Sequence, residues 1–481
     1  MRDADIGMTT PIISSFLGDE KPSDAPTFDQ VRPQDGRIIG RIAESGQSGV
    51  EAAVAVATAA FAAHRSSPVH QRVGWLKSAA DALAQTVDEI AALICEDVGK
   101  PIRIARGEVR RGAEFLEATA ATLTQLGGEV LPLDVTAAGA GHFGYTRHVP
   151  YGVVAGITPF NAPVNLLVQK VAPAIAAGNA VITKPAPAGT RTALRLARLF
   201  QDAGWPKGLF TVLTGDKETA LALASHPTVR AVSFTGGTTA GDALARAAGA
   251  KKFVAELGSN AANVVLADAD IQEAAQKIAA AAFEASGQQC ISAQRVLVEK
   301  PVFDAFVQSF AAAASKLKVG RADDPATDVG PMVSRAAAER VMAMCEDAIA
   351  SGATYALEPQ HTDALVSPGI LLNVPRTARL WREEVFGPMA IVVPFEGVAD
   401  GLALANDSPF GLQGAVFTSN LRSAFQFADQ FDVGALWINE ASRFRLDIYP
   451  FGGMKQSGVG REGLRYAIEE FSQVKFIGIR A

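Results

Sequence analysis

The sequence predicts an α/β fold in which parallel strands alternate with helices. After Pro150, short apolar segments of strand-like composition alternate with segments whose apolar residues recur every three or four positions. This alternation is typical of parallel strands joined by helical crossovers, and such doubly wound sheets bind ligands beyond the carboxyl ends of their strands. The expected strands are 152–157, 180–184, 209–213, 231–234 and 252–256, and the expected helices are 164–177, 190–203, 218–225 and 239–248.

The segments on either side follow other patterns. Residues 48–125 show helical spacing, whereas residues 126–147 are rich in Gly with alternating apolar positions, which predicts a protruding strand pair. A second α/β stretch continues to about Tyr466, and residues 471–479 are expected to form a terminal strand. The elements expected in the second stretch are a helix at 271–285, a strand near 295–298 and helices at 302–317 and 336–350.

Composition and charge exclude several classes of protein. The chain has 481 residues, enough for roughly three domains. Its net charge is -6 and it has no long basic run, so no nucleic-acid partner is expected. No apolar run is long enough for a membrane span or a signal-peptide core, which makes the cytoplasm the expected location. The three cysteines and six histidines show neither a disulfide framework nor zinc-like spacing, so no metal is expected.

Cys290 is the candidate nucleophile. It stands in Gly287-Gln288-Gln289-Cys290, directly after an expected helix, where the glycine permits an irregular backbone. Most lone cysteines are inert buried thiols, and Cys95 and Cys345, which lie inside helical patterns, are expected to be of that kind. A catalytic thiol must reach the thiolate state and needs a nearby base or positive dipole.

Two polar residues follow expected strands of the parallel sheet. Glu256 ends the fifth strand, and a carboxylate at that position can face a cleft, although a solvated strand-end acid is the commoner case when the residue is taken singly. Asn161 follows the first strand, between Pro159 and Pro163, so that a stiff backbone directs its amide. The alternative is an ordinary turn Asn that bonds its own backbone.

Two Gly-rich segments resemble phosphate-binding loops. Residues 458–463 match the G-x-G-x-x-G pattern, but too little chain follows for the βαβ unit of about 30 residues that this fingerprint requires. We therefore regard this match as accidental. Residues 234–241 connect an expected strand to an expected helix, and they can present backbone N–H groups and a helix N-terminus to an anion.

Taken together, these motifs resemble those of the aldehyde dehydrogenase superfamily. The resemblance covers roughly residues 30–475 and rests on eight motifs in the expected order. In chain order the motifs are Pro159-Phe160-Asn161, Lys184-Pro185, Phe234-Thr235-Gly236 with Gly241, Glu256-Leu257-Gly258, Gly287-Gln288 with Cys290, Glu384 with Phe386-Gly387-Pro388, Asn406 with Phe410-Gly411-Leu412, and Pro450-Phe451-Gly452-Gly453 with Lys455, Ser457 and Gly458.

The resemblance implies an α/β fold with two doubly wound parallel-sheet domains plus a small β oligomerisation arm. Residues 1–122 and 145–257 would form the dinucleotide-binding domain, and residues 258–467 the catalytic domain. Residues 123–144 and 468–481 would form the arm. Because strand addition between subunits covers exposed sheet edges, a homodimer or homotetramer is expected.

The resemblance also implies an enzyme that oxidises an aldehyde to a carboxylic acid with NAD or NADP. The Cys290 thiolate would attack the aldehyde carbon, and the Asn161 amide and the Cys290 backbone N–H would stabilise the oxyanion. Loss of hydride from the thiohemiacetal would give a thioester, and Glu256 would activate the water that hydrolyses it.

The cofactor-binding residues follow from the same resemblance. Lys184 would reach the adenosine ribose, Glu384 the nicotinamide ribose and Phe386 the nicotinamide ring. The other expected cofactor contacts are Thr235, Gly236 and Gly237 along the diphosphate, with Thr158, Pro159, Gly215 and Leu257. Pro187 stands where the family often has a Glu that bonds the ribose 2′-hydroxyl, so the carboxylate that would repel a 2′-phosphate is missing and NADP is admitted beside NAD.

Arg111, Arg445 and Gln289 are the candidate substrate-binding residues. The regions of the two arginines resemble family members that oxidise aldehydes with an anionic end, such as relatives of succinic semialdehyde, lactaldehyde and phosphonoacetaldehyde. An Arg fork binds a carboxylate or phosphonate well, although solvated surface ion pairs explain the same arginines. Gln289 stands where some of those relatives carry another Arg, which argues against a doubly charged substrate. The expected substrate is a short, acidic aldehyde.

Three other functions remain as alternatives. In a CoA-acylating semialdehyde dehydrogenase, CoA rather than water would resolve the thioester, but such relatives usually lack the base at Glu256. A non-catalytic relative would only bind the dinucleotide, and Cys290, Glu256 and Asn161 argue against it. A cofactor-free thiol hydrolase would leave the dinucleotide motifs without a use.

Overall fold

The strand–helix alternation after residue 150 forms a doubly wound sheet in the computed structural model, which describes residues 10–20 and 24–480. The strand order is β22-β10-β9-β6-β7-β8, with β22 antiparallel to β10 and the other neighbours parallel. The chain order reverses between β6 and β9, which makes their carboxyl ends the topological switch point where such sheets bind ligands. The strands are β6 (Val153–Thr158), β7 (Ala180–Pro185), β8 (Phe210–Val212), β9 (Val229–Thr235), β10 (Lys252–Glu256) and β22 (Gly458–Val459).

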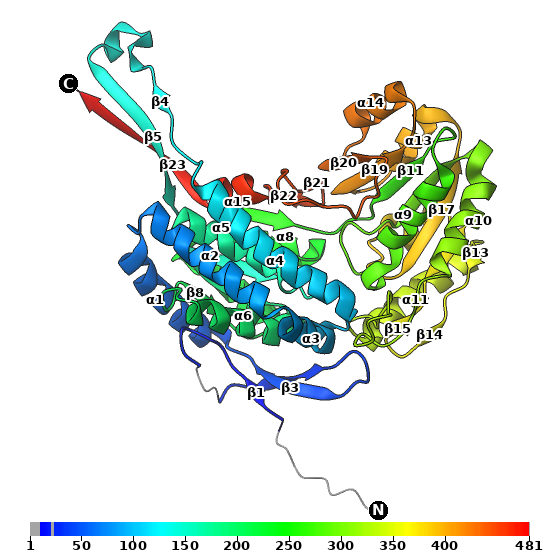
Figure 1. Ribbon diagram of the computed structural model, residues 1–481, viewed down its shortest axis with the longest axis horizontal. Coiled ribbons are helices and arrows are strands. Elements are labelled where there is room, and N and C mark those ends of the chain that lie inside the picture. Colours follow the sequence, from blue (N-terminus) through cyan, green and yellow to red (C-terminus); the bar gives the residue numbers. More distant parts are fainter. Residues whose placement is uncertain (1–9, 21–23, 481) are drawn as a thin grey trace, which may run out of the picture.

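Helices cover both faces of this first sheet, and every residue of β6 and β7 is buried as a result. Helices α2 and α4 lie against α5, α3 lies against α6, and α1 packs on α7 and β7 (Figure 1). The helices are α1 (Gly46–His64), α2 (Val69–Gln85), α3 (Val87–Val98), α4 (Ile102–Leu123), α5 (Asn165–Ala177), α6 (Thr190–Asp202), α7 (Lys217–Ser225) and α8 (Thr238–Ala248).

A small sheet precedes these helices. Its strand order is β1-β3-β2, and an isolated bridge between Phe16 and Val212 connects this region to β8. The strands are β1 (Ile12–Ile13), β2 (Thr27–Val31) and β3 (Ile38–Ala43).

The second α/β stretch forms a seven-stranded sheet with the order β13-β16-β17-β12-β11-β19-β20. Only the edge strand β13 is antiparallel to its neighbour, and separate apolar clusters cover the two faces. The sheet strands are β11 (Ala262–Val265), β12 (Arg295–Glu299), β13 (Thr354–Leu357), β16 (Gly369–Leu372), β17 (Met389–Phe395), β19 (Gln413–Phe417) and β20 (Ala435–Ile438). Its helices are α9 (Ile271–Phe283), α10 (Phe303–Ala314), α11 (Arg335–Ala350), α12 (Arg379–Arg382), α13 (Gly397–Asn406) and α14 (Leu421–Gln430).

Short elements complete this part of the chain. Helix α15 packs on α4 and α5, so the chain returns to the first sheet after passing through all the strands of the second. The remaining elements are β14 (His361–Thr362), β15 (Leu365–Val366), β18 (Phe410–Gly411), β21 (Met454–Lys455) and α15 (Leu464–Glu470).

One expected helix is shorter than its sequence pattern. Residues 271–285 were expected to be helical throughout, but α9 ends at Phe283. Ala285, Ser286 and Gly287 all have positive φ, at 53°, 58° and 63°. A right-handed helix cannot continue through such residues, so the expectation was wrong at its last turn.

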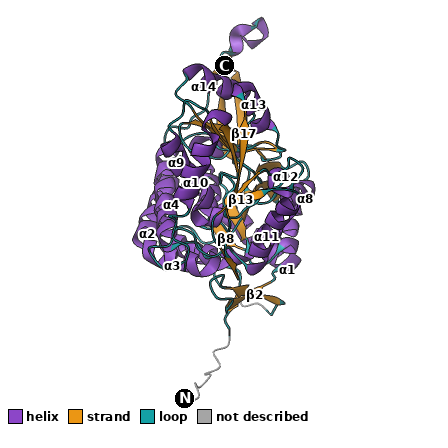
Figure 2. Ribbon diagram, turned by 90° about the vertical axis from the view of Figure 1, so that its right-hand side faces the viewer, coloured by secondary structure: helices purple, strands orange, loops and turns teal. Residues whose placement is uncertain are grey.

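The β arm extends away from both sheets (Figures 1 and 2). Its antiparallel order is β23-β5-β4, formed by β4 (Val130–Leu131), β5 (His142–Pro150) and β23 (Ser472–Arg480). The expected strand pair in 126–147 is therefore uneven, because β4 has only two residues and β5 pairs mainly with the terminal strand.

These observations confirm the expected α/β fold with two parallel-sheet units and an added β arm. The domain boundaries remain a proposal, since β22 falls within 258–467 and α15 begins there, but both pack on the first unit. None of the helices in the described ranges is both long and apolar enough to cross a membrane.

Candidate active site

Two cavities meet at Cys290. The larger, about 810 Å³, follows the carboxyl ends of β6, β7, β9 and β10 and is called the strand-end cavity. The smaller, about 560 Å³, lies between α4, α5, α9 and the 440–445 segment and is called the basic cavity. Both are lined by Asn161, Leu166 and Cys290, so a molecule in either cavity can reach the thiol.

The backbone before Cys290 has a fixed irregular shape. The three left-handed residues 285–287 lead into the cysteine, and a Cβ on Gly287 would lie 2.2 Å from the carbonyl oxygen of Gly387. Glycine is therefore required at 287. Ser286 Oγ donates to the Gly330 carbonyl at 2.7 Å, and Gln288 Oε1 accepts from the Val333 amide at 3.0 Å. These contacts hold the loop at the junction of the cavities.

Cys290 is partly exposed, whereas Cys95 and Cys345 are buried, as expected for inert thiols. Burial raises the pKa of the Cys290 thiol to about 12, with further increases from the charges of Glu256 and Glu384 and an opposing effect of Arg445. The thiolate therefore needs additional positive charge or a base when the site is working.

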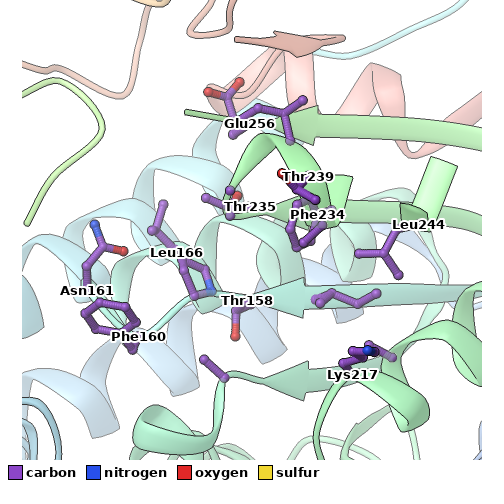
Figure 3. A pocket seen from close by; sticks show the side chains of 18 of the residues that line it. Thr158, Phe160, Asn161, Leu166, Lys217, Phe234, Thr235, Thr239, Leu244 and Glu256 are labelled. Atoms are coloured by element: carbon purple, nitrogen blue, oxygen red, sulfur yellow. The ribbon is translucent and has the colours of Figure 1, made fainter. Parts of the chain in front are cut away.

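Asn161 faces the cysteine loop from the turn after β6. Its Nδ2 donates to the Gln288 carbonyl oxygen at 2.9 Å, which fixes the direction of the amide. An amide nitrogen carries two hydrogens, so the second remains for a bound oxygen atom. Figure 3 shows Asn161 and Phe160 beside Thr158, with Thr235 and Glu256 at neighbouring strand ends.

Glu256 lies at the end of β10 and lines the strand-end cavity. It is 2% exposed, and neither carboxyl oxygen has a hydrogen-bond partner in the described ranges. Burial and the nearby Glu462 raise the pKa of this carboxyl well above its usual range, while Arg445 and Lys170 oppose the rise. A carboxyl kept unpaired at this cost is typical of a functional site.

The G-x-G-x-x-G segment at 458–463 lies beside Glu256 rather than forming a phosphate loop. Strand β22 pairs with Ala255 and Glu256, and a Cβ on Gly458 would lie 2.2 Å from the Ala255 carbonyl oxygen. Close approach of two backbones explains this glycine without any ligand.

A buried charged cluster behind Glu256 was not anticipated from the sequence. Glu462 accepts from Lys170 Nζ at 3.0 Å and from Arg445 Nη2 at 3.1 Å. The Arg445 guanidinium lies 3.6 Å from the centre of the Phe451 ring. One signal was available, because Lys170 is the one charged residue in α5, a helix of mostly apolar residues that is buried along its length.

Nine of the ten expected cofactor residues line the strand-end cavity. They are Thr158, Pro159, Lys184, Thr235, Gly236, Gly237, Leu257, Glu384 and Phe386. Gly215 is not among the lining residues; its φ of 137° places it in a turn against Thr219, and the following Asp216 and Lys217 face the cavity instead.

The strand-end cavity has the features that a dinucleotide requires. Thr235 Oγ1 is buried there without a partner among the described residues, and a Cβ on Gly237 would meet nothing within 4 Å. Helix α8 begins at Thr238, so its N-terminal N–H groups face a site suited to an anion. Burial lowers the pKa of Lys184 to about 8, opposed by Asp216 and Glu44.

Glu384 and Phe386 lie across this cavity from the strand ends. Glu384 Oε1 accepts from the Ser259 amide at 3.0 Å, and burial raises the pKa of Glu384 to about 7. Phe386 contacts Phe160 edge-to-face, with ring centres 5.9 Å apart. Arg340 also lines the cavity, and it donates to the carbonyl oxygens of Glu384 and Val385, a contact that the sequence analysis missed.

The three expected substrate residues all line the basic cavity. Arg111 makes a bidentate ion pair with Asp447, at 2.9 and 2.6 Å. Gln289 Oε1 accepts from Arg443 Nε at 2.8 Å. Six basic residues line this cavity against three acidic ones; they are Lys100, Arg103, Arg111, Lys277, Arg443 and Arg445 against Glu108, Glu284 and Glu440. Arg103, Lys277 and Arg443 were not singled out from the sequence.

The chain is similar to known proteins over nearly its whole length. A profile described as the aldehyde dehydrogenase family matches residues 21–477. A 3-sulfolactaldehyde dehydrogenase of Priestia megaterium is 40% identical over 424 residues, covering 88% of this chain and 89% of the relative.

Two solved structures are similar over nearly the whole chain. Aldehyde dehydrogenase 21 from Physcomitrella patens, in complex with the reaction product succinate, has a TM-score of 0.93 at 30% identity and covers 98% and 99% of the two chains. NADP-dependent glyceraldehyde-3-phosphate dehydrogenase from Bacillus halodurans, complexed with NADP, has a TM-score of 0.94 at 31% identity and covers 97% and 99%. The chain therefore belongs to the aldehyde dehydrogenase family.

Proposed function

We propose that this chain oxidises a short aldehyde with an anionic end to the carboxylic acid, with NAD or NADP as hydride acceptor. The position of Cys290 carries the proposal, because the thiol lines both the strand-end cavity and the basic cavity. A nucleophile there faces a dinucleotide on one side and an anionic substrate on the other.

The strand-end cavity would hold the dinucleotide. Lys184 and Lys217 lie at the end assigned to the adenosine ribose, and Glu384 and Phe386 lie at the end assigned to the nicotinamide. Thr235 and the start of α8 would donate to the diphosphate. The structure of the B. halodurans relative contains NADP, which supports NADP, with its 2′-phosphate, as a cofactor that this fold can bind.

The residues around Cys290 would carry out the oxidation and the hydrolysis in successive steps. The Cys290 thiolate attacks the aldehyde carbon, and the oxyanion accepts hydrogen bonds from Asn161 Nδ2 and the Cys290 backbone N–H. When bound, the dinucleotide supplies the ring that accepts the hydride, which leaves the substrate carbon on Cys290 as a thioester. Glu256 then takes a proton from water, whose oxygen attacks the thioester carbon and releases the acid and the thiolate.

The basic cavity would bind the anionic end of the substrate. Arg111 and Arg445 face it from opposite parts of the chain, and the excess of basic over acidic lining residues favours an anion. One relative is named for the small anionic aldehyde 3-sulfolactaldehyde, and the structure of aldehyde dehydrogenase 21 holds the anionic reaction product succinate. The base at Glu256 favours water over CoA as the group that resolves the thioester.

A substrate screen tests the proposal. We expect NAD(P)H formation from short aldehydes that carry a carboxylate or sulfonate, with kcat/KM about tenfold or more above that for uncharged aldehydes of equal length. Product analysis should find free acid without added CoA. Equal turnover of long apolar aldehydes, or a requirement for CoA, would contradict the proposal.

Cofactor preference gives a second prediction. Pro187 lines the strand-end cavity near Lys184, and neither Lys184 nor Lys217 forms an ion pair with any described residue. Pro187→Glu should lower kcat/KM for NADP by about tenfold or more, because a carboxylate would face the 2′-phosphate. NAD should be affected much less. Pro187→Gln is the matched control, since it removes the ring without adding charge, and an equal loss in that variant would contradict the electrostatic reason.

The arm supports a homodimer or homotetramer. Val130, Phe143, Phe476 and Ile479 of its strands are exposed, and β4 and β23 leave open sheet edges. Strand addition or apolar packing between copies of the chain would cover these surfaces.

A further inference from the structure

The Gln289 amide has a defined orientation next to the nucleophile. Arg443 Nε is 2.8 Å from Gln289 Oε1, and because an arginine N–H only donates, the contact atom must be the amide oxygen. The two N–H groups on Nε2 therefore point away from Arg443. No acceptor among the described residues bonds Nε2, and Gln289 lines the basic cavity together with Cys290.

Arg443 is held from its other side. Its Nη1 donates to Glu284 Oε2 at 2.5 Å, and Glu284 lies at the start of the irregular segment that leads to Cys290. Arg103 approaches the other oxygen of Glu284 at 4.0 Å and pairs with Asp328 at 2.7 Å. The Arg443 guanidinium is thus held by Gln289 through Nε and by Glu284 through Nη1.

The other cations of the basic cavity already have carboxylate partners. Arg111 is bidentate with Asp447, and Arg445 pairs with Glu462. Their net attraction for a substrate anion is reduced by these partners, although Arg445 Nε has no hydrogen-bond partner among the described residues. A neutral amide whose N–H₂ has no partner among the described residues adds a directional hydrogen bond beside these paired charges.

We infer that Arg443 is a positioning residue that turns the Gln289 amide so that its N–H₂ donates to an oxygen of the substrate's anionic end. Gln289 thereby selects a singly charged carboxylate or sulfonate close to the aldehyde carbon. The inference rests on the proposed function, and it assigns the selectivity to an amide donor rather than to arginine charge alone.

Gln289→Glu tests the donor directly. The new carboxylate keeps the side-chain shape and still accepts from Arg443, but it removes the N–H₂ group and adds negative charge. We expect kcat/KM for succinic semialdehyde to fall by about 10- to 100-fold, the loss expected for one hydrogen bond to a charged acceptor, mainly through KM. For butanal, the uncharged aldehyde of equal length, the loss should be at least about tenfold smaller, because the charge added beside Cys290 affects both aldehydes whereas the lost hydrogen bond affects only succinic semialdehyde.

Gln272→Glu is the matched control, because it makes the same chemical change on the exposed face of α9. It should leave both aldehydes unaffected. Equal losses for succinic semialdehyde and butanal in Gln289→Glu would overturn the inference. Failure of the wild-type chain to oxidise either aldehyde would instead count against the proposed function.

A double-mutant cycle tests the role of Arg443. Arg443→Met should reduce the preference for succinic semialdehyde in the wild-type background but by less than about twofold in Gln289→Ala, because residues that act through each other are not additive. Arg443→Lys, which can still donate to Gln289 Oε1, should recover part of the loss. Additive losses would show that Arg443 acts by its own charge and would overturn its positioning role.

Discussion

Cys290→Ala is expected to abolish NAD(P)H formation from every aldehyde, by about 10⁴-fold or more, because the nucleophile and the covalent intermediate are lost together. Among the described residues the two cavities share only Asn161, Leu166 and Cys290 in their linings, and the Asn161 and Leu166 side chains cannot form the thioester. Dinucleotide affinity should remain, since the expected adenosine and diphosphate contacts lie along the strand ends.

Steady-state rates and a fluorescence titration with NADPH measure the two expectations separately. Cys345→Ala is the matched control, because that thiol lies in the core of the second sheet, away from both cavities. It should retain activity. Residual turnover in Cys290→Ala above about one per cent of wild type would refute the nucleophile assignment.

Glu256→Gln is expected to stop the reaction after the first turnover. Attack by Cys290 needs no base at 256, but hydrolysis of the thioester does, so steady-state kcat should fall by about 10²- to 10⁴-fold. Mixing the variant with substrate and NADP should release one equivalent of NADPH per site. Intact-mass measurement should find the acyl group on Cys290. A variant that turns over normally, or that shows no burst, would assign the water-activating role elsewhere.

The same carboxyl sets a pH dependence. Burial and Glu462 raise the pKa of Glu256, so its basic form is present only at higher pH, and kcat should fall as the pH drops through that raised pKa. Arg445 opposes the rise, so Arg445→Met should move the profile towards alkaline pH. The residual kcat of Glu256→Gln should lose this dependence.

The folding stability should depend on pH in the opposite direction to kcat. Because the folded state raises the pKa of Glu256, folding favours its protonated form, and this contribution is present at low pH and lost as pH rises through the raised pKa. Glu256→Gln removes the ionisable group. Relative to wild type, the variant should gain free energy of unfolding as the pH rises from the usual carboxyl range to pH 8, because the wild-type carboxyl must then ionise in its buried site. Thermal midpoints measured across that range provide the check.

The alternating pattern after residue 150 predicted the strands and helices of the first sheet within a few residues, because local periodicity and turn residues determine such elements. The same approach was wrong at the end of α9. Ala and Ser favour a continued helix locally, but the loop must pass Gly387 and reach the cavities, and these tertiary contacts override propensity at 285 and 286.

Candidate site residues were found from sequence where they lie in short motifs. Cys290, Glu256 and Asn161 each stand in a run of a few residues, next to glycines, prolines or a strand end. Arg443, Lys170 and Arg340 have no such run around them. Their roles depend on partners far along the chain, such as Gln289, Glu462 and the carbonyl groups of residues 384 and 385.

The sequence alone therefore determined the α/β class, the family and the identity of the nucleophile, base and amide that we propose. Three features were visible only in the tertiary structure. The Cys290 thiol lines both cavities, Asp447 forms an ion pair with Arg111, and Arg443 donates a hydrogen bond to Gln289. The local sequence pattern reflects the hydrogen bonding and burial of residues within one helix or strand. Contacts between residues 154 or 336 positions apart depend instead on how the two sheets and their connecting segments pack against each other.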